Sequence, residues 1–285
     1  MSIDVDAIIA WIAENWIWPA AIVGVIVLFF IVIALLPDAR ISTNPAFPVE
    51  GDEARDLAVG AIQITTSFGA WNDPEAHAIS ESKSLRKNLV EMWGLTDRAS
   101  WLATIQELPE RRSDPLRDSL LRLRASVADS LGRRPTKKEW VRAAKEQGAG
   151  GRDVTDTIST IVALESGFKK KKLGTLVLPD SATIRSSTGY AYGQCAALAT
   201  WGVALGFATR DEIRPILADI SARARSEFGS WEEFGRSYLL GRSLRLVEQG
   251  MDTEKALEKA DDGLTAYGRA FDVKRGGGPW STLTW

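Results

Sequence analysis

Histidine and cysteine, the side chains most often used for metal binding and nucleophilic catalysis, each occur once in this 285-residue sequence, as His77 and Cys195. A zinc site needs at least three protein ligands, usually drawn from histidines and cysteines. A serine triad or a Cys–His pair would need His77, in a polar stretch of the N-terminal half, to reach the C-terminal half. Cys195 lies in an alanine-rich segment, where we expect a buried and inert thiol. The sequence therefore predicts no catalytic residues, no metal site and no cofactor.

A second set of residues with chemical potential lies in the segment SWEEFGRSYLLGR, residues 230–242. On a helix, Tyr238 and Arg242 are one turn apart. Gly235 and Gly241 each cost about 1 kcal/mol inside a helix relative to alanine. Close packing of another backbone is the interpretation that we favour, and the alternative is a shallow groove that is floored by these glycines and charged by Arg242. The candidate groove for a ligand or partner comprises Trp201, Trp231, Glu233, Tyr238 and Arg242.

Helices must position these residues, because helix-capping signals recur along the chain. Capping boxes, in which a hydroxyl and a glutamate three residues later satisfy free backbone N–H groups, begin at Thr136, Thr209 and Ser230. The expected helices span residues 52–70, 82–93, 97–108 (with Thr96 as N-cap), 115–131, 137–147, 153–166, 188–203, 210–228, 231–248 and 253–270. Only residues 175–179 (TLVLP) have a strand pattern. The predicted fold class is all-α, with one multi-helix domain over residues 52–272 and a flexible tail at 273–285.

Residues 17–36, IWPAAIVGVIVLFFIVIALL, contain no charged side chain. At about 1.5 Å per residue, a helix of this length spans roughly 30 Å, the thickness of the hydrocarbon core of a bilayer. Trp11, Trp16 and Trp18 would form an aromatic belt, and residues 1–16 are expected to lie on the membrane surface. A cleaved signal peptide is the alternative, but the preceding region is acidic and no Ala-x-Ala site follows. We predict a transmembrane helix at 17–36 and a linker at 37–51.

The charges that flank this hydrophobic run predict its orientation. The N-terminal side carries acidic residues and no lysine or arginine, whereas Arg40 and Arg55 follow the run. The positive-inside rule then places the domain in the cytoplasm, anchored by a single pass in the inner (plasma) membrane. The lipid bilayer is therefore the first expected partner. The formal net charge of −2 provides no global attraction for nucleic acid.

One region is basic on a local scale. Residues 98–152 contain 13 lysines and arginines against 7 acidic residues, so the segment 111–145 within them is a candidate nucleic-acid-binding surface. A solvated helix face near the anionic leaflet is the interpretation that we favour, and lipid headgroups are the next. The run Lys169–Lys172 is expected to form an exposed loop.

Residues 190–242 resemble the bacterial family numbered 1266 among the domains of unknown function. The matching segments are Trp201-Gly202, Gly206-Phe207, Thr209-Arg210-Asp211-Glu212 and Phe228 to Phe234, with Tyr238, Gly241 and Arg242, and upstream Trp93-Gly94-Leu95-Thr96-Asp97 with Leu102. The resemblance covers about residues 85–245 and implies a related helical fold without an established reaction. The family pattern carries Trp-Asp-x-x-Arg where this chain has residues 190–194, so Ala191 and Gln194 replace the acid and the arginine. The resemblance implies that any chemistry of these two groups in relatives is lost here.

Three functions follow from the sequence. The leading hypothesis is a non-catalytic interaction or scaffold module at the membrane, with an unidentified protein partner. The second is an enzyme or small-anion-binding protein that uses a groove near Trp231, Tyr238 and Arg242. The third is a membrane-tethered nucleic-acid binder that uses the basic region 111–145. The scarcity of histidine and cysteine favours the first hypothesis over the second.

Overall fold

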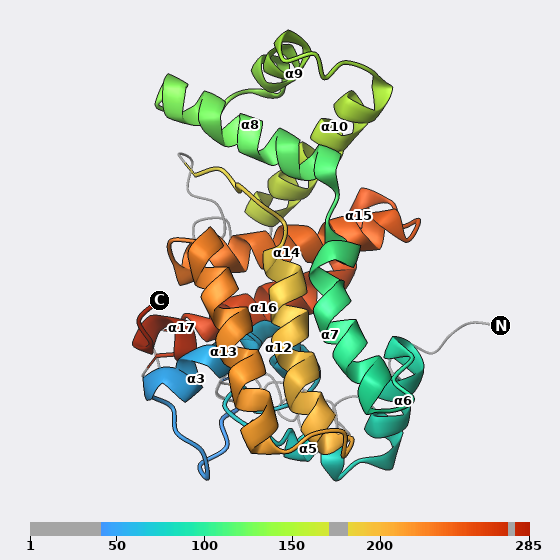
Figure 1. Cartoon of the computed structure of the whole chain (residues 1–285). Coiled ribbons are helices and arrows are strands. Elements are labelled where there is room, and N and C mark those ends of the chain that lie inside the picture. The colour runs from blue at the N-terminus through green and yellow to red at the C-terminus, as the bar shows by residue number, and fades with distance from the viewer. Residues whose placement is uncertain (1–40, 171–181, 273–276) are drawn as a thin grey trace, which may run out of the picture. The chain divides into compact units, whose positions relative to one another are not determined.

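The computed structural model describes residues 41–170, 182–272 and 277–285, and within these ranges the chain forms helices and no β-strand. Figure 1 shows how the helices succeed one another along the chain. The helices are α3 (Gly51–Ala58), α4 (Ala61–Thr66), α5 (His77–Ser80), α6 (Lys83–Trp93), α7 (Arg98–Arg112), α8 (Pro115–Leu131), α9 (Lys137–Glu146), α10 (Arg152–Phe168), α12 (Gly189–Ala204), α13 (Arg210–Glu227), α14 (Trp231–Glu248), α15 (Thr253–Lys259), α16 (Asp261–Ala270) and α17 (Pro279–Thr282). This confirms the all-α fold class for the described part.

Two predicted elements lie outside the described residues. They are the transmembrane helix at 17–36, with the preceding segment 1–16, and the short strand at 175–179. Among the residues that the structure does describe, no helix combines the length and the apolar character needed to cross a bilayer.

Helix α12 is the centre of the domain, because almost all of its residues are buried. It packs against α7, α13 and α14, and Figure 1 shows it running beside α7 and α13. Glycine allows its neighbours to approach closely. A Cβ atom at Gly202 would lie 2.3 Å from the indole of Trp101, and one at Gly193 would lie 2.6 Å from the ring of Tyr238. A helix that is apolar on all sides is typical of such a buried position.

The residues predicted to open capping boxes, Thr136, Thr209 and Ser230, each lie at the start of a helix. Capping boxes begin α9 at Thr136 and α13 at Thr209, and the Ser230 hydroxyl accepts a hydrogen bond from a backbone N–H at the start of α14. The prediction that Thr96 caps α7 was wrong by one residue, because Asp97 caps this helix together with Ser100. The carboxylate of Asp97 is a stronger acceptor for the free N–H groups than a threonine hydroxyl.

Two predicted helices are each divided in the structure. The segment 52–70 forms α3 and α4, which are separated at Val59 and Gly60, and the segment 253–270 forms α15 and α16, which meet at Ala260. At the first break α12 passes very close to the chain. A Cβ atom at Gly60 would lie 3.2 Å from the Cβ of Ala196 and 3.3 Å from the backbone nitrogen of Ala197. Tertiary packing therefore overrides the local helical pattern here.

The prediction of a flexible tail at 273–285 was wrong for its described part, residues 277–285. Trp280 is 3% exposed, and its indole N–H donates to the carbonyl of Ala58 at 2.9 Å. The carbonyl of Leu283 accepts a hydrogen bond of 2.9 Å from Trp231. Trp280 stacks on Trp231 with ring centroids 5.4 Å apart. The aromatic residues compensate for the glycine-rich local sequence, because their burial and hydrogen bonds stabilise the packed segment.

Residues 41–48, expected to be part of a linker, are attached to the domain. The amide of Asn72, itself buried, donates to the carbonyls of Asn44 and Phe47 at 2.9 and 3.0 Å, and its oxygen accepts from the Asn44 backbone N–H at 2.7 Å. Ile41 is also buried. A buried amide with several backbone partners fixes the conformation of the segment that it binds.

Helices α8, α9 and α10 pack on one another, around a buried ion pair. Both terminal nitrogens of Arg124 donate to the carboxylate of Glu165, at 2.5 and 2.6 Å. The same guanidinium lies 4.6 Å from the ring centre of Trp140, which is fully buried. This bidentate geometry aligns α8 with α10, and the cation–π contact adds α9.

Candidate functional site

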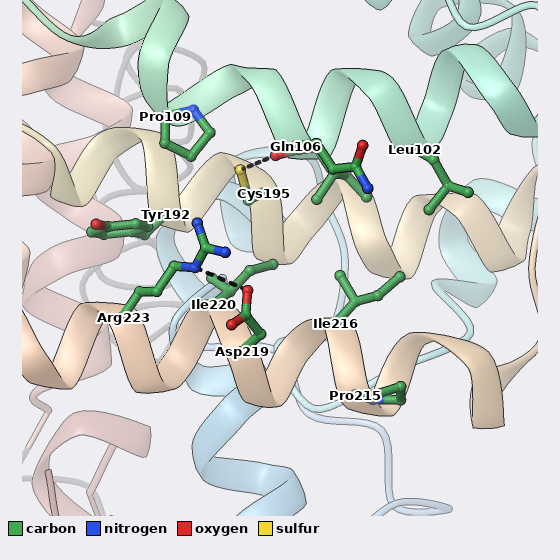
Figure 2. Close-up of a pocket in the computed structure, with 11 residues that line it drawn as sticks. Leu102, Gln106, Pro109, Tyr192, Cys195, Pro215, Ile216, Asp219, Ile220 and Arg223 are labelled. Atoms are coloured by element: carbon green, nitrogen blue, oxygen red, sulfur yellow. Dashed lines mark hydrogen bonds and ion pairs between the residues drawn. The ribbon is translucent and has the colours of Figure 1, made fainter.

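The candidate site is a groove between α7 and α13, floored by α12, with a volume of about 340 Å³. Helix α12 packs against both neighbours, whereas α7 and α13 make few contacts with each other. Figure 2 shows the side chains that line the space between these helices. They are Leu102, Ile105, Gln106 and Pro109 from α7, Tyr192 and Cys195 from α12, and Pro215, Ile216, Asp219, Ile220 and Arg223 from α13.

Proline residues shape both walls of the groove. Pro109 has no backbone N–H, so the carbonyl of Ile105, one turn earlier in α7, lacks its helical partner. The thiol of Cys195 donates to this carbonyl at a sulfur–oxygen distance of 3.4 Å. Pro215 removes the corresponding N–H in α13. The thiol therefore has a structural role, since it satisfies a buried carbonyl that the helix cannot satisfy.

The groove has an apolar half and a polar half. Leu102, Ile216 and Pro215 gather at one end in Figure 2, while Tyr192 and the Asp219–Arg223 pair lie toward the other. The Asp219 carboxylate and the Nε of Arg223 are 2.9 Å apart. This arrangement provides an apolar surface beside hydrogen-bonding groups.

Ion pairs surround the groove. Beyond its apolar end, Arg98 at the start of α7 pairs with Glu212 at the start of α13 at 3.0 Å. On the outer face of α7, Glu107 pairs with Arg111 at 2.5 Å. Together with Asp219 and Arg223, these charges are already paired within the chain. The rim therefore has no surplus charge with which to attract an ionic ligand.

Burial keeps the potential nucleophiles of the groove protonated. Burial raises the pKa of the Cys195 thiol to about 12. Burial, followed by the nearby carboxylate of Glu227, raises the pKa of Tyr192 to about 12. The hydroxyl of Tyr192 donates to this carboxylate at 3.2 Å. Near neutral pH both groups stay in their neutral forms, which are poor nucleophiles.

The structure does not bring the five predicted groove residues together. Trp201 is 3% exposed and contacts Trp93, with ring centroids 6.4 Å apart. Trp231 is buried in the aromatic cluster that contains Trp280. Tyr238 is fully buried, and burial raises the pKa of its hydroxyl, which donates to the side chain of Gln63 at 2.8 Å. These three aromatic side chains belong to the core and do not wall a surface groove.

The charged members of the predicted set have partners in the chain. Arg242 forms a bidentate pair with Asp262 at 2.7 and 2.8 Å. The carboxylate of Glu233 accepts from the backbone N–H of Gly229 at 2.7 Å and lies beside a polar cavity of about 470 Å³. The glycines between these residues are sites of close packing. A Cβ atom at Gly235 would lie 2.4 Å from Tyr267, which favours the packing interpretation of the glycines.

The single histidine lies elsewhere. Nδ1 of His77 is 3.0 Å from both carboxylate oxygens of Asp73, and this hydrogen bond raises the pKa of the imidazole. The side chain is 44% exposed. His77 does not line the groove that contains Cys195.

Much of the positive charge in the basic region 111–145 is neutralised inside the chain. Arg117 pairs with Glu248, Arg124 pairs with Glu165, and Arg133 pairs with Glu139. Arg117 and Arg124 are also buried. This pairing reduces the surplus charge on which the nucleic-acid hypothesis depends.

A family model described as protein of unknown function, DUF1266, matches residues 88–285, which is more than half of the chain. The chain belongs to the DUF1266 family. No curated protein and no solved structure matches it.

The match extends the expected resemblance, which covered residues 85–245, through the packed segment 277–285. Its central helix α12 contains the two positions at which this chain departs from the expected pattern. Ala191 is fully buried, and the amide oxygen of the buried Gln194 accepts a hydrogen bond of 3.2 Å from Arg112. In this DUF1266 domain, the side chain at position 194 therefore binds an arginine of α7.

Proposed function

We propose that this DUF1266 protein is a non-catalytic binding module held at a membrane, and that the groove between α7, α12 and α13 binds apolar side chains of a helix from a partner protein. The observation that carries the proposal is the apolar half of this groove, beside charged side chains that are already paired with one another. Protein interfaces commonly place an apolar core inside a polar rim.

The charge pattern around the groove supports an apolar occupant. Asp219 and Arg223 neutralise each other at 2.9 Å, and Glu212 pairs with Arg98 at 3.0 Å. A charged ligand would have to break one of these pairs to bind strongly. An apolar side chain that enters the half of the groove lined by Leu102 is removed from water, and this burial contributes about 25 cal/mol of binding free energy per Å² of buried surface.

The dimensions of the groove support a short helical contact. Its α13 wall presents Ile216, Ile220 and Arg223, at the spacing of one and two helical turns. A partner helix that binds in a groove typically presents its own apolar anchors at i and i+3 or i+4, which is the same one-turn repeat. The groove volume of about 340 Å³ lies at the lower end of the usual range for ligand pockets. A space of this size accommodates a few side chains of a partner helix.

The membrane part of the proposal rests on the uncharged run at residues 17–36. Its length suits a bilayer, and Arg40 and Arg55 lie on its C-terminal side. An anchor of this kind confines the domain to the membrane surface. The partner is therefore expected to be a membrane protein or a protein that is itself recruited to the membrane.

Site-specific photo-crosslinking tests the groove in the full-length protein. A photoreactive amino acid at Ile216, on the half-buried rim, should give a discrete protein adduct in the native membrane. The matched control is the same amino acid at Ala222, an exposed position of α13 that does not line the groove. A peptide that carries the cross-linked segment should then bind the purified full-length protein.

The substitution Leu102→Asp, on the opposite wall, should abolish the adduct and weaken peptide binding by at least about tenfold, because it places a carboxylate against the apolar anchors. If the photoreactive residue captures only a small molecule, the groove binds a small apolar ligand and the proposal of a partner helix is refuted. Equal adducts at residues 216 and 222, or a peptide that binds the Leu102→Asp variant as well as the parent, would refute the proposed site.

A further inference from the structure

Arginine residues from the end of α7, the start of α8 and the C-terminal half of α14 form a cluster, and they outnumber the carboxylates paired with them. The group comprises Arg112, Arg117, Arg242 and Arg245, with the carboxylates of Glu248 and Asp262 and the side chains of Tyr190 and Gln194. None of these residues lines the groove between α7, α12 and α13.

The two carboxylates are occupied by three of the arginines. One oxygen of Glu248 accepts from Arg117 at 2.5 Å, and the other lies 3.4 Å from Arg245. Both oxygens of Asp262 accept from one terminal nitrogen of Arg242, at 2.7 and 2.8 Å, and one of them also accepts from the backbone N–H of Gly263 at 2.7 Å. Three of the four guanidinium groups thus pair with these two carboxylates, and the buried carboxylate of Asp118 accepts from Ser113 and Ser187 instead, which leaves a local surplus of positive charge.

Arg112 carries the unpaired charge. No carboxylate of the described residues lies within ion-pair distance of its guanidinium, and its only side-chain hydrogen bond there joins Nε to Gln194 at 3.2 Å. A second guanidinium is held close by, because Arg117 donates to the backbone carbonyl of Arg112 at 2.7 Å. The N–H groups on the two terminal nitrogens of Arg112 therefore make no hydrogen bond to a described residue.

Tyr190 provides a further free donor at the same place. The guanidinium carbon of Arg112 lies 5.8 Å from the centre of the Tyr190 ring, which packs edge-on against Tyr238. The Tyr190 hydroxyl makes no hydrogen bond to a described residue. Burial raises the pKa of this hydroxyl, while the charges of Arg242, Arg112 and Arg245 oppose the increase. Three guanidinium charges therefore act on the space around this hydroxyl.

The half-buried position of Arg112 makes its charge costly without an anion. Burial lowers the pKa of Arg112, and the positive charge of Arg245 lowers it further. An oxyanion placed beside both groups would reverse these two effects. Guanidinium groups bind carboxylate and phosphate oxygens through parallel hydrogen bonds, so the chemistry of the donors specifies the class of ligand.

We propose that Arg112, Arg245 and Tyr190 form a binding site for a small oxyanion, a phosphate or carboxylate group. This site goes beyond the proposed partner groove and shares no side chain with it. The oxyanion could come from a soluble molecule or from the headgroup of an anionic lipid, because both present the same oxygen atoms.

The test uses the full-length protein in nanodiscs of phosphatidylcholine, titrated calorimetrically with inorganic phosphate and, separately, with citrate. We expect saturable binding of at least one of them. Arg112→Gln and Arg245→Gln should each reduce the affinity by at least about tenfold, since each removes a charged donor. Arg112→Lys should bind more weakly than the parent, because it keeps the charge and loses the planar fork.

The matched control is Arg111→Gln, which removes the same charge from the adjacent residue, one that is exposed and paired with Glu107. It should change the affinity by less than about twofold, because exposed charges are screened by solvent. Equal losses in Arg111→Gln and Arg112→Gln, or no saturable binding of either anion to the parent, would overturn the site. The melting temperature of each variant without anion shows whether a loss of binding merely reflects unfolding.

A second arm identifies the source of the oxyanion. Nanodiscs that contain phosphatidylglycerol should weaken the apparent affinity of the parent for the soluble anion if the lipid headgroup occupies the site. Arg112→Gln should then lose this lipid dependence. Equal anion affinity in both kinds of nanodisc assigns the site to a soluble molecule. A failure of partner cross-linking at Ile216 leaves these results unchanged, so the two proposals fail separately.

Discussion

The substitution Gly241→Ala tests whether close packing explains the glycines of α14. A Cβ atom at this position would lie 2.3 Å from the backbone oxygen of Ser187 and 2.8 Å from the Cβ of Tyr190. Ordinary contacts begin at 3.4 Å, so the backbone around Ser187 must move by about 1 Å. This backbone leads into Gly189, whose N–H donates to the Ser237 hydroxyl at 2.9 Å.

The expected change in the free energy of unfolding is the sum of two destabilising effects and one stabilising effect. Overpacking in a core costs about 1–3 kcal/mol, and disturbance of the Gly189–Ser237 hydrogen bond costs about 0.5–1.5 kcal/mol. Alanine regains about 1 kcal/mol of helix propensity. The free energy of unfolding should therefore fall by about 2 kcal/mol, which lowers the melting temperature of a domain of this size by roughly 4–8 °C.

The assay is urea unfolding of residues 41–285, followed by tryptophan fluorescence. Gly263→Ala is the matched control, because the three atoms nearest to a Cβ at Gly263 belong to the side chains of Arg242 and Leu239, at 3.3–3.5 Å, and none of them is a backbone atom. This control should be neutral or stabilising by up to about 1 kcal/mol. If Gly241→Ala is as stable as the parent and has the same dependence on urea, the close-packing explanation is refuted.

Further predictions test other features. The full-length protein should stay with membranes after an alkaline carbonate wash, whereas a chain without residues 1–40 should be released as a folded domain; extraction of the full chain by the wash would refute the anchor. A cysteine at Ser42 should be protected from impermeant thiol reagents in intact cells and one at Ser2 should react, and the reverse pattern would invert the orientation. The Cys195 thiol should react with Ellman's reagent at pH 8 only after unfolding, because its pKa is raised to about 12. Since the folded pKa lies above the ordinary value of 9.0, Cys195 stabilises the fold fully below pH 9 and loses this effect as the pH rises toward 12, so the free energy of unfolding should decrease over this interval.

The replacement Trp280→Ala tests the packed segment 277–285. It should reduce the free energy of unfolding by about 3–5 kcal/mol, because it removes a buried indole and its hydrogen bond to Ala58. The exposed Leu131→Ala is a suitable comparison, with an expected change within about 0.5 kcal/mol. Urea unfolding measures both, and equal stability of the two variants would show that residues 277–285 do not stabilise the core.

Local signals predicted the helices well where capping chemistry determines an end. Helices α8 and α14 occupy the predicted residues, because Pro115 suits the first position of α8 and the Ser230 hydroxyl caps the start of α14. The breaks at Gly60 and Ala260 were not predictable in this way. The first depends on the approach of α12, which lies more than a hundred residues further along the chain.

The groove was not predicted because its lining residues come from three separate segments. Ile216 lies in the helix that the sequence predicts at 210–228, but whether its side chain lies in the core or on a rim depends on the spacing of α7 and α13. Prolines inside helical patterns were the signal that could have drawn attention to these walls, since Pro109 and Pro215 both face the groove. The large apolar rings of Trp231 and Tyr238 suggested a ligand-binding surface, but the same hydrophobic surface favours burial, and both side chains lie in the core.

The hydrogen bond between Trp280 and the carbonyl of Ala58 joins residues that are 222 positions apart. During synthesis the ribosome delivers α3 and α14 well before it delivers residue 280. Until then Trp231 and Phe234 lack the indole that packs against them, so the nascent chain exposes an apolar surface that chaperones recognise. The domain therefore completes its folding late in translation, and a premature stop codon just before residue 277 would produce an aggregation-prone polypeptide although almost every helix had been made.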